Sequence, residues 1–355
     1  MPFRCLRGAA IALILAAGAA HSAEFCAATT NMIRQALATA GSNGEADIVR
    51  IVIGTYTPTT GSIAFPYSTS ENHALTIEGG YTFGCGLRVD DADLTVLSGG
   101  GARPVMRIES NGSGAVTVRN LGIKDGESSG HGAGLDIDGP GLPFFVGFTG
   151  SINVERVAFL FNRTSDDAGG MYLATRDGSI TVRGNLFAFN RCSGDNCALQ
   201  IHSGAAEPIN VRFGGNTVTL NTCNLGASAC NSGGARFTGQ QNLLLYDNLF
   251  ALHGGGDISL QNPAVTAALY YNNYEVMIGS ADDEVGSLNV SNPGFVDALG
   301  EDFRLQSTSP LRNQGNAPYA LPSVDLDGHP RIIESAPDLG AYESLDILFA
   351  DDFDG

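Results

Sequence analysis

The sequence predicts an all-β fold: a single-stranded, right-handed parallel β-helix of roughly nine coils, each built from three short strands. Two observations predict it. A strand-like block recurs every 24 to 32 residues, and two further short strands keep a fixed order around each copy. The 47 glycines among 355 residues suit a fold with many turns.

The repeat is clearest in the middle of the chain. Copies of the block begin at Val157, Asn185, Asn216, Asn248 and Asn272, so the starting positions advance by 28, 31, 32 and 24 residues. Apolar residues alternate inside each copy, which is the period of a strand and not of a helix. Because no copy is long enough to pack alone, we expect each strand to pair with its equivalent one coil away.

Two further strands accompany each block. The first strand precedes the block, with apolar residues five and three positions ahead of the block's start. The second strand follows the block after a loop of variable length. The apolar pairs that mark them are Ile152/Val154, Ile180/Val182, Val211/Phe213 and Leu243/Leu245, and then Met171/Leu173, Leu199/Ile201, Ala235/Phe237 and Ile258/Leu260. The asparagines at the turns could contact a ligand or could stack their amides to hold a bend, and we expect the structural role.

The ends of the stack need covers, because raw strand edges pair with other chains. Residues 24–47 predict a capping helix, with Thr29 or Thr30 as N-cap and Gly41 as the stop. Residues 48–290 then form the β-helix, and residues 291–344 form a C-terminal coil and cap. We expect one elongated body, because no linker divides these parts.

The two termini predict an exported protein. Arg4 and Arg7 precede an apolar stretch, so residues 1–23 are typical of a signal peptide, and we expect a secreted or cell-envelope location, extracellular or periplasmic. Nothing downstream has the length and apolar character of a transmembrane segment. Residues 345–355 form an acidic-aromatic tail that either directs export or is a frayed end.

Cysteine usage supports the same compartment. Removing residues 1–23 takes Cys5 away and leaves an even number, as expected for disulfides: Cys26, Cys85, Cys192, Cys197, Cys223 and Cys230. Short spacing favours Cys192–Cys197 and Cys223–Cys230, which leaves Cys26–Cys85. The crossed pairing of Cys192 with Cys223 and Cys197 with Cys230 is the alternative. Zinc-ligand spacing is absent.

Charge excludes several partners. Residues 1–23 hold two of the 19 basic residues and none of the 37 acidic ones, so the rest of the chain carries a net charge of −20. Nucleic acid and anionic lipid need basic patches, and an anionic polysaccharide would need bridging calcium. Tryptophan is absent, so Tyr or Phe would have to stack on a sugar ring.

Motifs at both ends of the chain resemble a known family. Gly54-Thr-Tyr56 and Ile77-Glu-Gly-Gly-Tyr81 lie near the start, and Asp325-Leu-Asp-Gly-His-Pro-Arg331 and Asp338-Leu-Gly-Ala-Tyr-Glu343 lie near the end. These motifs, with Asn292-Pro-Gly-Phe295 and Asn313-Gln-Gly315, resemble bacterial secreted right-handed parallel β-helix proteins with a choice-of-anchor Q type domain. The resemblance implies a secreted or surface-displayed β-helix and implies no established reaction.

Enzymatic alternatives have only fragments in their favour. Gly130-His-Gly132 and Asp166-Asp167 resemble pieces of polygalacturonase-like hydrolases, but their order is reversed. A calcium-dependent lyase would need clustered acidic ligands and a base, for which Lys124 is the sole lysine. Arg183 and Arg212 occupy matching positions and could bind a uronate chain, although outward arginines on a sheet are more often solvated. The alternative catalytic set is therefore Lys124, Arg183, Arg212, Asp166 and Asp167.

Calcium is the one cofactor that the sequence suggests. Asp325-x-Asp327-Gly328 with Glu334 is similar to part of a calcium loop, which needs more ligands than these to be complete. The other interpretation is that Asp325 and Asp327 shape a turn.

The loops between the second and third strands of each coil should line one edge of the stack. They span residues 125–134, 162–170, 190–198, 221–234 and 253–257. Together they present His131, Asp166, Asp167, Asp195, His253 and Asp257. Such a row makes a binding edge, although insertions also collect wherever a coil tolerates them.

These observations predict an exported, monomeric, non-catalytic β-helix that binds a polysaccharide or cell-surface ligand in adhesion or glycan binding. The alternative function is a polysaccharide lyase or glycoside hydrolase on a pectate-lyase-like β-helix.

Overall fold

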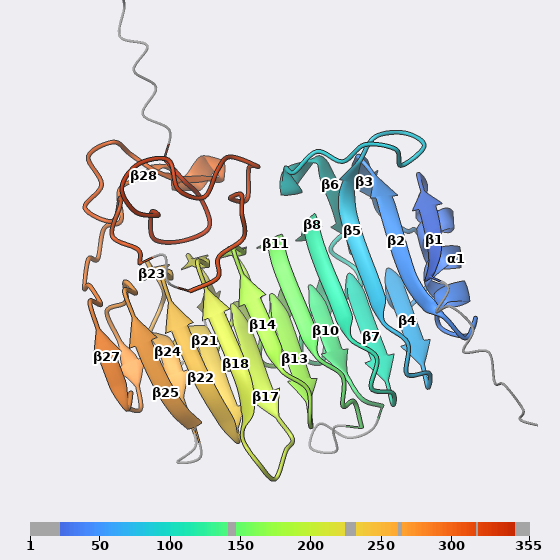
Figure 1. The fold of residues 1–355 in the computed structure, drawn as a ribbon, viewed down its shortest axis with the longest axis horizontal. Helices are drawn as coiled ribbons and strands as arrows, with labels where there is room; N and C mark the ends of the chain where they lie inside the picture. The colour runs from blue at the N-terminus through green and yellow to red at the C-terminus, as the bar shows by residue number, and fades with distance from the viewer. Residues whose placement is uncertain (1–21, 141–146, 224–231, 262–264, 317–318, 345–355) are drawn as a thin grey trace, which may run out of the picture.

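The computed structural model describes residues 22–140, 147–223, 232–261, 265–316 and 319–344. It is a right-handed parallel β-helix, whose coils stack along the long axis with helix α1 (Thr30–Ala40) at one end (Figure 1). Every strand pair between coils is parallel, and the single antiparallel pair of strands in the described ranges lies in the C-terminal segment. The predicted fold class is confirmed.

Sheet A, with 15 strands, forms one side of the stack. Its main path is β1 (Ser22–Ala27), β2 (Ala46–Val52), β5 (Leu75–Tyr81), β8 (Val116–Lys124), β11 (Ile152–Leu160), β14 (Ile180–Arg183), β18 (Ile209–Gly214), β22 (Gln241–Tyr246), β25 (Val265–Tyr270) and β27 (Asp283–Val285). Shorter strands continue it around a corner: β3 (Gly54–Tyr56), β6 (Thr95–Ser98), β15 (Leu186–Ala188), β19 (Thr217–Thr219) and β23 (Leu249–Ala251).

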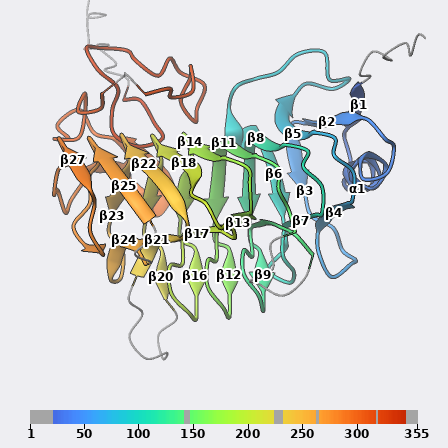
Figure 2. The same cartoon turned by 60° about the horizontal axis from the view of Figure 1, so that its bottom comes forward.

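Two more sheets complete the coils. Sheet B comprises β4 (Phe65–Thr69), β7 (Met106–Ser110), β10 (Leu135–Asp138), β13 (Met171–Thr175), β17 (Leu199–Ser203), β21 (Ser232–Gly239), β24 (Gly256–Leu260) and β26 (Met277–Ile278). Sheet C comprises β9 (Glu127–Ser128), β12 (Arg163–Thr164), β16 (Arg191–Cys192) and β20 (Thr222–Cys223), a row of two-residue strands along one edge (Figure 2). The sequence repeat did not reveal sheet C, because two residues give no alternation to detect.

The predicted registers are confirmed. Ile180 pairs with Val211 and Met171 with Leu199, as the repeat offsets require. Alternate residues of the longer strands of sheets A and B point inward, and they form one continuous apolar core along the stack. Phe159 stacks on Phe187 of the next coil with a centroid distance of 4.7 Å. Burial of such ladders supplies the main stabilisation, since no strand could bury its apolar face alone.

Buried asparagines form two ladders at the corners. In the first, the Nδ2 of Asn185 donates to Oδ1 of Asn216 at 2.9 Å, and Asn216 donates in the same way to Asn248 at 3.0 Å. In the second, Asn162 donates to Asn190 at 3.0 Å and Asn190 to Asn221 at 2.9 Å. The residue before each of these positions has a positive φ, as Gly184 and Phe189 do at 66° and 57°. The ladders satisfy the polar groups that such bends would otherwise bury unpaired.

The N-terminal cap follows the prediction. Thr29 is the N-cap of α1 and its hydroxyl accepts from the Met32 N–H at 3.2 Å, while Gly41 ends the helix. Strand β1 was not expected; it adds a rung before the helix and pairs with β2. The predicted disulfide between Cys26 of β1 and Cys85 is present, with Cα atoms 5.7 Å apart.

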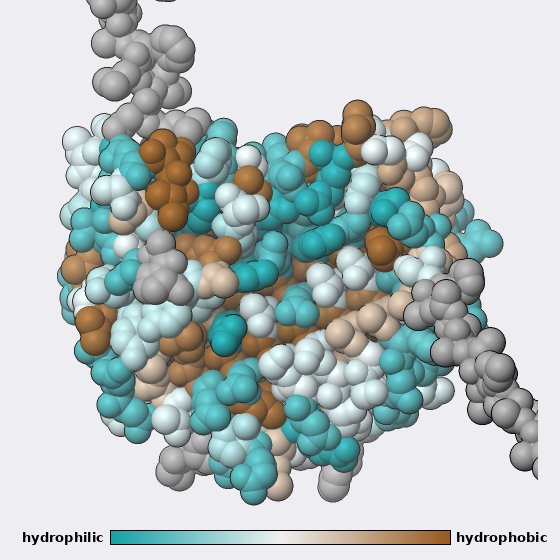
Figure 3. Space-filling model, in the orientation of Figure 1, coloured by the Kyte–Doolittle hydropathy of each residue, from teal (hydrophilic) through white to brown (hydrophobic). Residues whose placement is uncertain are grey.

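The C-terminal segment folds back onto the outside of the stack. Strands β28 (Phe295–Asp297) and β29 (Asp302–Leu305) form its antiparallel pair, and Phe303 and Leu339 pack with Leu186 and Leu249 of the corner strands in a second apolar cluster. Figure 3 shows apolar bands between polar residues along this side of the molecule, reaching toward that segment. The predicted signal peptide, apart from residues 22 and 23, and the 345–355 tail lie outside the described residues.

Candidate functional site

The outward face of sheet B carries a row of polar side chains, some of which are shielded from solvent. Along one row the register aligns Arg107, Asp136, Tyr172, Gln200 and Arg236 on successive strands. Asp136 is only 7% exposed and Tyr172 only 3%. Outward residues of a sheet normally face water, so something must cover this row.

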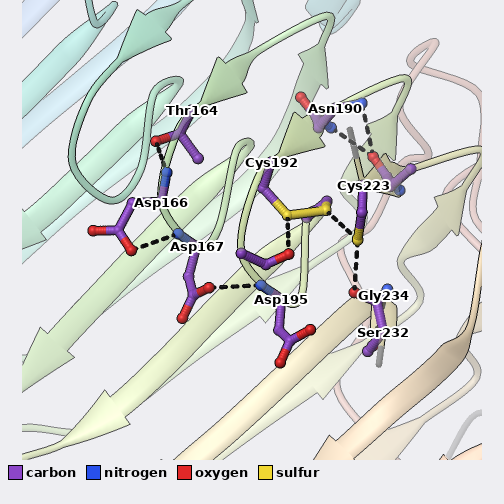
Figure 4. Close-up of a disulfide and its surroundings, with 12 residues drawn as sticks. Thr164, Asp166, Asp167, Asn190, Cys192, Asp195, Cys223, Ser232 and Gly234 are labelled. Carbon is purple, nitrogen blue, oxygen red and sulfur yellow. Dashed lines mark hydrogen bonds between the residues drawn. A yellow bond between two sulfur atoms is a disulfide. The ribbon is translucent and has the colours of Figure 1, made fainter. Parts of the chain in front are cut away.

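The cover is a wall of loops between sheets C and B. Consecutive loops are tied to one another, since Asp167 Oδ1 accepts from the Asp195 N–H at 2.6 Å (Figure 4). The Oδ2 of Asp167 lies 3.3 Å from Nη1 of Arg236 on β21. Burial is the main cause that raises the pKa of Asp167, against the lowering effect of Arg236. The wall is therefore joined to the sheet at its base.

A disulfide stiffens the same wall. Cys192 and Cys197 are bonded, as predicted from their spacing, which excludes the crossed pairing for these two residues. The Sγ of Cys197 lies 3.2 Å from the Sγ of Cys223, which is itself disulfide-bonded (Figure 4). Cys230, its predicted partner, lies outside the described residues. These sulfurs are close enough for a metal site, but disulfide sulfurs are not thiolate ligands.

Between the wall and the N-terminal half of sheet B lies a hollow of about 770 Å³. We call it the groove. It lies within the size range of small-molecule and cofactor sites. Its charged and imidazole side chains are Arg103, Arg107, Glu127, His131, Asp136, Asp138 and Asp166.

Several buried polar atoms in the groove have no hydrogen-bond partner in the protein. They include Oδ1 of Asp136, Oδ1 of Asp138, Nδ1 of His131 and both Nε and Nη1 of Arg103. Each buried polar atom left unpaired costs about 1–3 kcal/mol. Because each of these atoms is almost completely covered in the unliganded chain, a polar ligand would reach them only with small side-chain movements.

Asp136 and Asp138 occupy alternate positions of β10, so both carboxyl groups leave the same face of the sheet. Burial raises the pKa of Asp136 well above its usual range, and the charge of Asp138 raises it further. Burial likewise raises the pKa of Asp138 to about 6, with Arg107 opposing the shift. Arg107 is shared between two carboxyl groups, since its Nε lies 2.9 Å from Glu109 Oε1 and 3.6 Å from Asp136 Oδ2. Its single charge therefore cannot neutralise both Asp136 and Asp138.

His131 forms the lip of the groove above these carboxyl groups. Its ring stacks on Tyr172 with a centroid distance of 4.8 Å, and its Nδ1 lies 3.6 Å from Oδ2 of Asp166. Burial raises the pKa of Tyr172, and the charges of Asp136 and Asp138 raise it further. The phenol therefore stays a neutral donor at physiological pH.

Four of the six residues of the predicted binding edge come together here: His131, Asp166, Asp167 and Asp195. The other two lie toward the C-terminal end of the stack. The side chain of His253 is fully enclosed, and burial lowers its pKa. The carboxylate of Asp257 accepts from the Glu275 and Val276 N–H groups at 2.7 and 3.0 Å. The loop between them is short, and both side chains are buried there, away from the groove.

The alternative catalytic set does not converge. Asp166 lines the groove and Asp167 lies in the wall beside it, whereas Arg183 and Arg212 lie on sheet A. Arg183 contacts Glu155 at 2.7 Å and donates to the Ala320 carbonyl, and Lys124 lies 3.3 Å from Glu301. These cations serve contacts between the stack and the C-terminal segment or between adjacent coils.

The two predicted calcium ligands have different surroundings. Asp325 is buried and its carboxylate accepts from the N–H groups of Asp327, His329 and Glu343, which shapes the turn. Asp327 lies within 4.8 Å of Asp325 and His329, and also within 4.8 Å of Asp91 and Asp93, measured between possible ligand atoms. Burial, followed by the charge of Asp325, raises the pKa of Asp327 to about 6. A hard cation would suit these oxygens, and calcium here stays a prediction.

Sequence reasoning missed Arg107, Asp136, Asp138 and Tyr172. The alternation Leu135-Asp-Ile-Asp138 marks a strand with two acids on one face, and this signal was available. It did not distinguish a solvated face from an enclosed one, because Asp166, Asp167 and Asp195 of the wall lie about 30 to 60 positions further along the chain.

Comparisons with known proteins add little beyond the fold. No family model matches the chain, and no curated protein matches it in sequence. Among solved structures, the crystal structure of pectate lyase Pel9A is similar, with 13% sequence identity and a TM-score of 0.42, over 84% of this chain and 88% of that chain. Such a likeness carries no argument about activity. No helix in the described ranges combines the length and apolar character needed to cross a membrane. The choice-of-anchor Q resemblance stays a prediction.

Proposed function

We propose that the protein binds a neutral polysaccharide in the groove on sheet B. The observation that carries this proposal is the set of unpartnered buried polar atoms on Asp136, Asp138, His131 and Arg103. Sugar hydroxyls both donate and accept hydrogen bonds, so a glycan can satisfy carboxylate, imidazole and guanidinium groups together. A groove open to solvent also admits an internal segment of a long chain.

The charge of the groove favours a neutral glycan over a polyuronate. Four acids line it, Glu127, Asp136, Asp138 and Asp166, against the two arginines. Arg107 is already engaged by Glu109. The sequence as a whole carries a formal charge of −18, which repels a polyanion further.

Binding is tested by affinity electrophoresis in gels containing xylan, galactan, arabinan, glucomannan, mixed-linkage β-glucan or dextran, with polygalacturonate as the anionic comparison. We expect retardation by at least one neutral glycan and weaker retardation by polygalacturonate. His131→Ala should weaken binding about fivefold, as for one lost hydrogen bond of about 1 kcal/mol. Arg212→Ala, which alters an exposed residue on sheet A, is the matched control. Absence of retardation by all six neutral glycans would refute the proposal.

We further propose that the chain is exported and displayed at the cell surface, as the choice-of-anchor resemblance implies. The disulfides at Cys26–Cys85 and Cys192–Cys197 support an oxidising compartment. Fractionation of cells that express the full chain, followed by immunoblotting of cytoplasm, envelope and medium, tests this proposal. Accumulation in the cytoplasm with reduced cysteines would contradict it.

A further inference from the structure

The carboxyl pair on β10 has the features of a catalytic pair. Asp136 and Asp138 leave the same face of one strand, both line the groove, and each has one oxygen without a partner. A rise of about 3.3 Å per residue places their Cα atoms roughly 6.6 Å apart. An inverting hydrolase needs its two carboxyl groups about 6.5–9.5 Å apart, a separation that two side chains rising from Cα atoms at this spacing reach when they diverge slightly.

The surroundings make the two groups unequal. Asp136 lies at the base of the groove beneath the loop wall, while Asp138 is less enclosed, at the end of the strand. The groups that face the pair are Arg107 and Glu109 from β7, His131 from the wall and Tyr172 from β13. Burial and the neighbouring acids hold a proton on Asp136, and Asp138 ionises above a pH of about 6. A pair whose environments push their pKa values apart is suited to acid and base roles.

We propose that Asp136 is the general acid and Asp138 the general base of an inverting glycoside hydrolase that acts on the neutral polysaccharide bound in the groove. This inference rests on the proposed function and goes beyond the non-catalytic role expected from the sequence. Asp136 donates its proton to the glycosidic oxygen, and the bond from that oxygen to C1 breaks with the electron pair staying on oxygen. Water attacks C1 from the opposite side and its proton passes to Asp138. The elements of one water are added, and exchange of protons with solvent restores both carboxyl groups.

His131 and Tyr172 are positioning residues in this scheme. The stacked rings close the side of the groove opposite β7 and limit the water that reaches Asp136. Arg107 Nε lies closer to Glu109 than to Asp136, at 2.9 against 3.6 Å, so its charge only partly opposes the effect of burial, which raises the pKa of Asp136.

The experiment measures reducing ends released from the six neutral glycans by the full chain, with binding measured in parallel. We expect hydrolysis of a glycan that binds, with product of inverted anomeric configuration in the first NMR spectra. Asp136→Asn and Asp138→Asn should each lower kcat at least 100-fold, while retardation in the gel changes less than about threefold. Asp177→Asn, which alters an exposed turn outside the groove, should leave kcat unchanged.

Two further readouts separate the acid from the base. An aryl glycoside with a dinitrophenolate leaving group needs no proton, so it should restore turnover in Asp136→Asn but not in Asp138→Asn. Azide needs no general base, so it should restore turnover in Asp138→Asn and give a glycosyl azide. The wild-type rate should rise as pH increases through about 6, because Asp138 must ionise. The residual rate of Asp138→Asn should no longer rise over this pH range.

The outcomes distinguish the inference from the proposed function. Glycan binding without release of reducing ends would overturn the catalytic roles and leave the binding proposal standing. Absence of binding would overturn both. Cleavage that persists in both Asn variants, or a product that retains its anomeric configuration, would overturn the assignment to this pair. Circular dichroism of each variant establishes that it is folded.

Discussion

The ladder that contains Asn185, Asn216 and Asn248 offers the sharpest test of what holds the stack together. Asn216 is fully buried and its side chain makes four hydrogen bonds. Its Oδ1 accepts from the backbone N–H and the Nδ2 of Asn185 at 3.0 and 2.9 Å. Its Nδ2 donates to the Val182 carbonyl at 3.1 Å and to Oδ1 of Asn248 at 3.0 Å. Asn216→Ala removes all four bonds at once.

The expected loss follows from these contacts. At about 0.5–1.5 kcal/mol net for each bond, the free energy of unfolding should fall by about 2–6 kcal/mol. The upper half of that range is expected, because the backbone N–H of Asn185 has its acceptor removed inside a buried corner. Asn210→Ala is the matched control, since Asn210 is exposed on β18 in the same coil, and it should change stability by less than about 0.5 kcal/mol.

Urea unfolding monitored by circular dichroism gives the two free energies, and amide hydrogen exchange locates the loss. We expect protection to fall first at Asn185 and Asn216 and at the rungs on either side, since each coil contacts only its neighbours. A loss below about 1 kcal/mol for Asn216→Ala, or a loss equal to that of Asn210→Ala, would refute the view that the ladder stabilises the coils.

Three other substitutions test separate parts of the fold. Replacing Cys26 and Cys85 by serine opens a loop of 59 residues, which should cost about 4 kcal/mol in urea unfolding; a change below 1 kcal/mol would contradict this estimate. Asp247 is buried and its pKa is raised to about 6 from 3.8, so folding retains a proton that the unfolded chain releases, and stability falls as pH rises between these values. Asp247→Asn should flatten the dependence of Tm on pH over pH 4–6, and an unchanged slope would count against this. Phe303 is 1% exposed, and its ring centroid lies 5.8 Å from that of Phe189. Phe303→Ala should therefore lower the free energy of unfolding by about 3–5 kcal/mol and speed proteolysis within residues 291–344. Equal cleavage rates for the variant and the wild type would argue against docking of the C-terminal segment through this ring.

The architecture was predictable because its determinants are local and repeated. The offset from Met171 to Leu199 is the same as that from Ile152 to Ile180, and a constant offset between strands is enough to define a coil. The asparagines at the bends repeat with the strands, so their stacking could be expected as well. Strand β1 and sheet C could not, since β1 lies beside the apolar leader-like stretch and the strands of sheet C have only two residues each.

The groove was predictable only in part, because its enclosure depends on contacts between coils that the local repeat does not specify. His131 and Asp166 could be placed at one edge because both follow the same position in the coil. The enclosure of Asp136 depends on Tyr172 and on the loop wall, whose lengths the repeat does not specify. His253 shows the converse: it occupies the equivalent place in sequence, yet its side chain is fully buried beside a shorter loop.

The unpartnered atoms of the groove persist because the scaffold is rigid. A gap of 3.6 Å separates Arg107 Nε from Asp136 Oδ2, and a small shift of β7 against β10 would close it and remove the electrostatic strain on Asp136. The two strands are fixed in register from Leu135–Met106 to Asp138–Glu109, their inward side chains belong to the continuous core, and adjacent coils prevent either rung from sliding. Sheet B thus holds its acids apart from their nearest cation at a cost in stability, and ligand hydroxyls can then supply the missing partners without any rearrangement of the backbone.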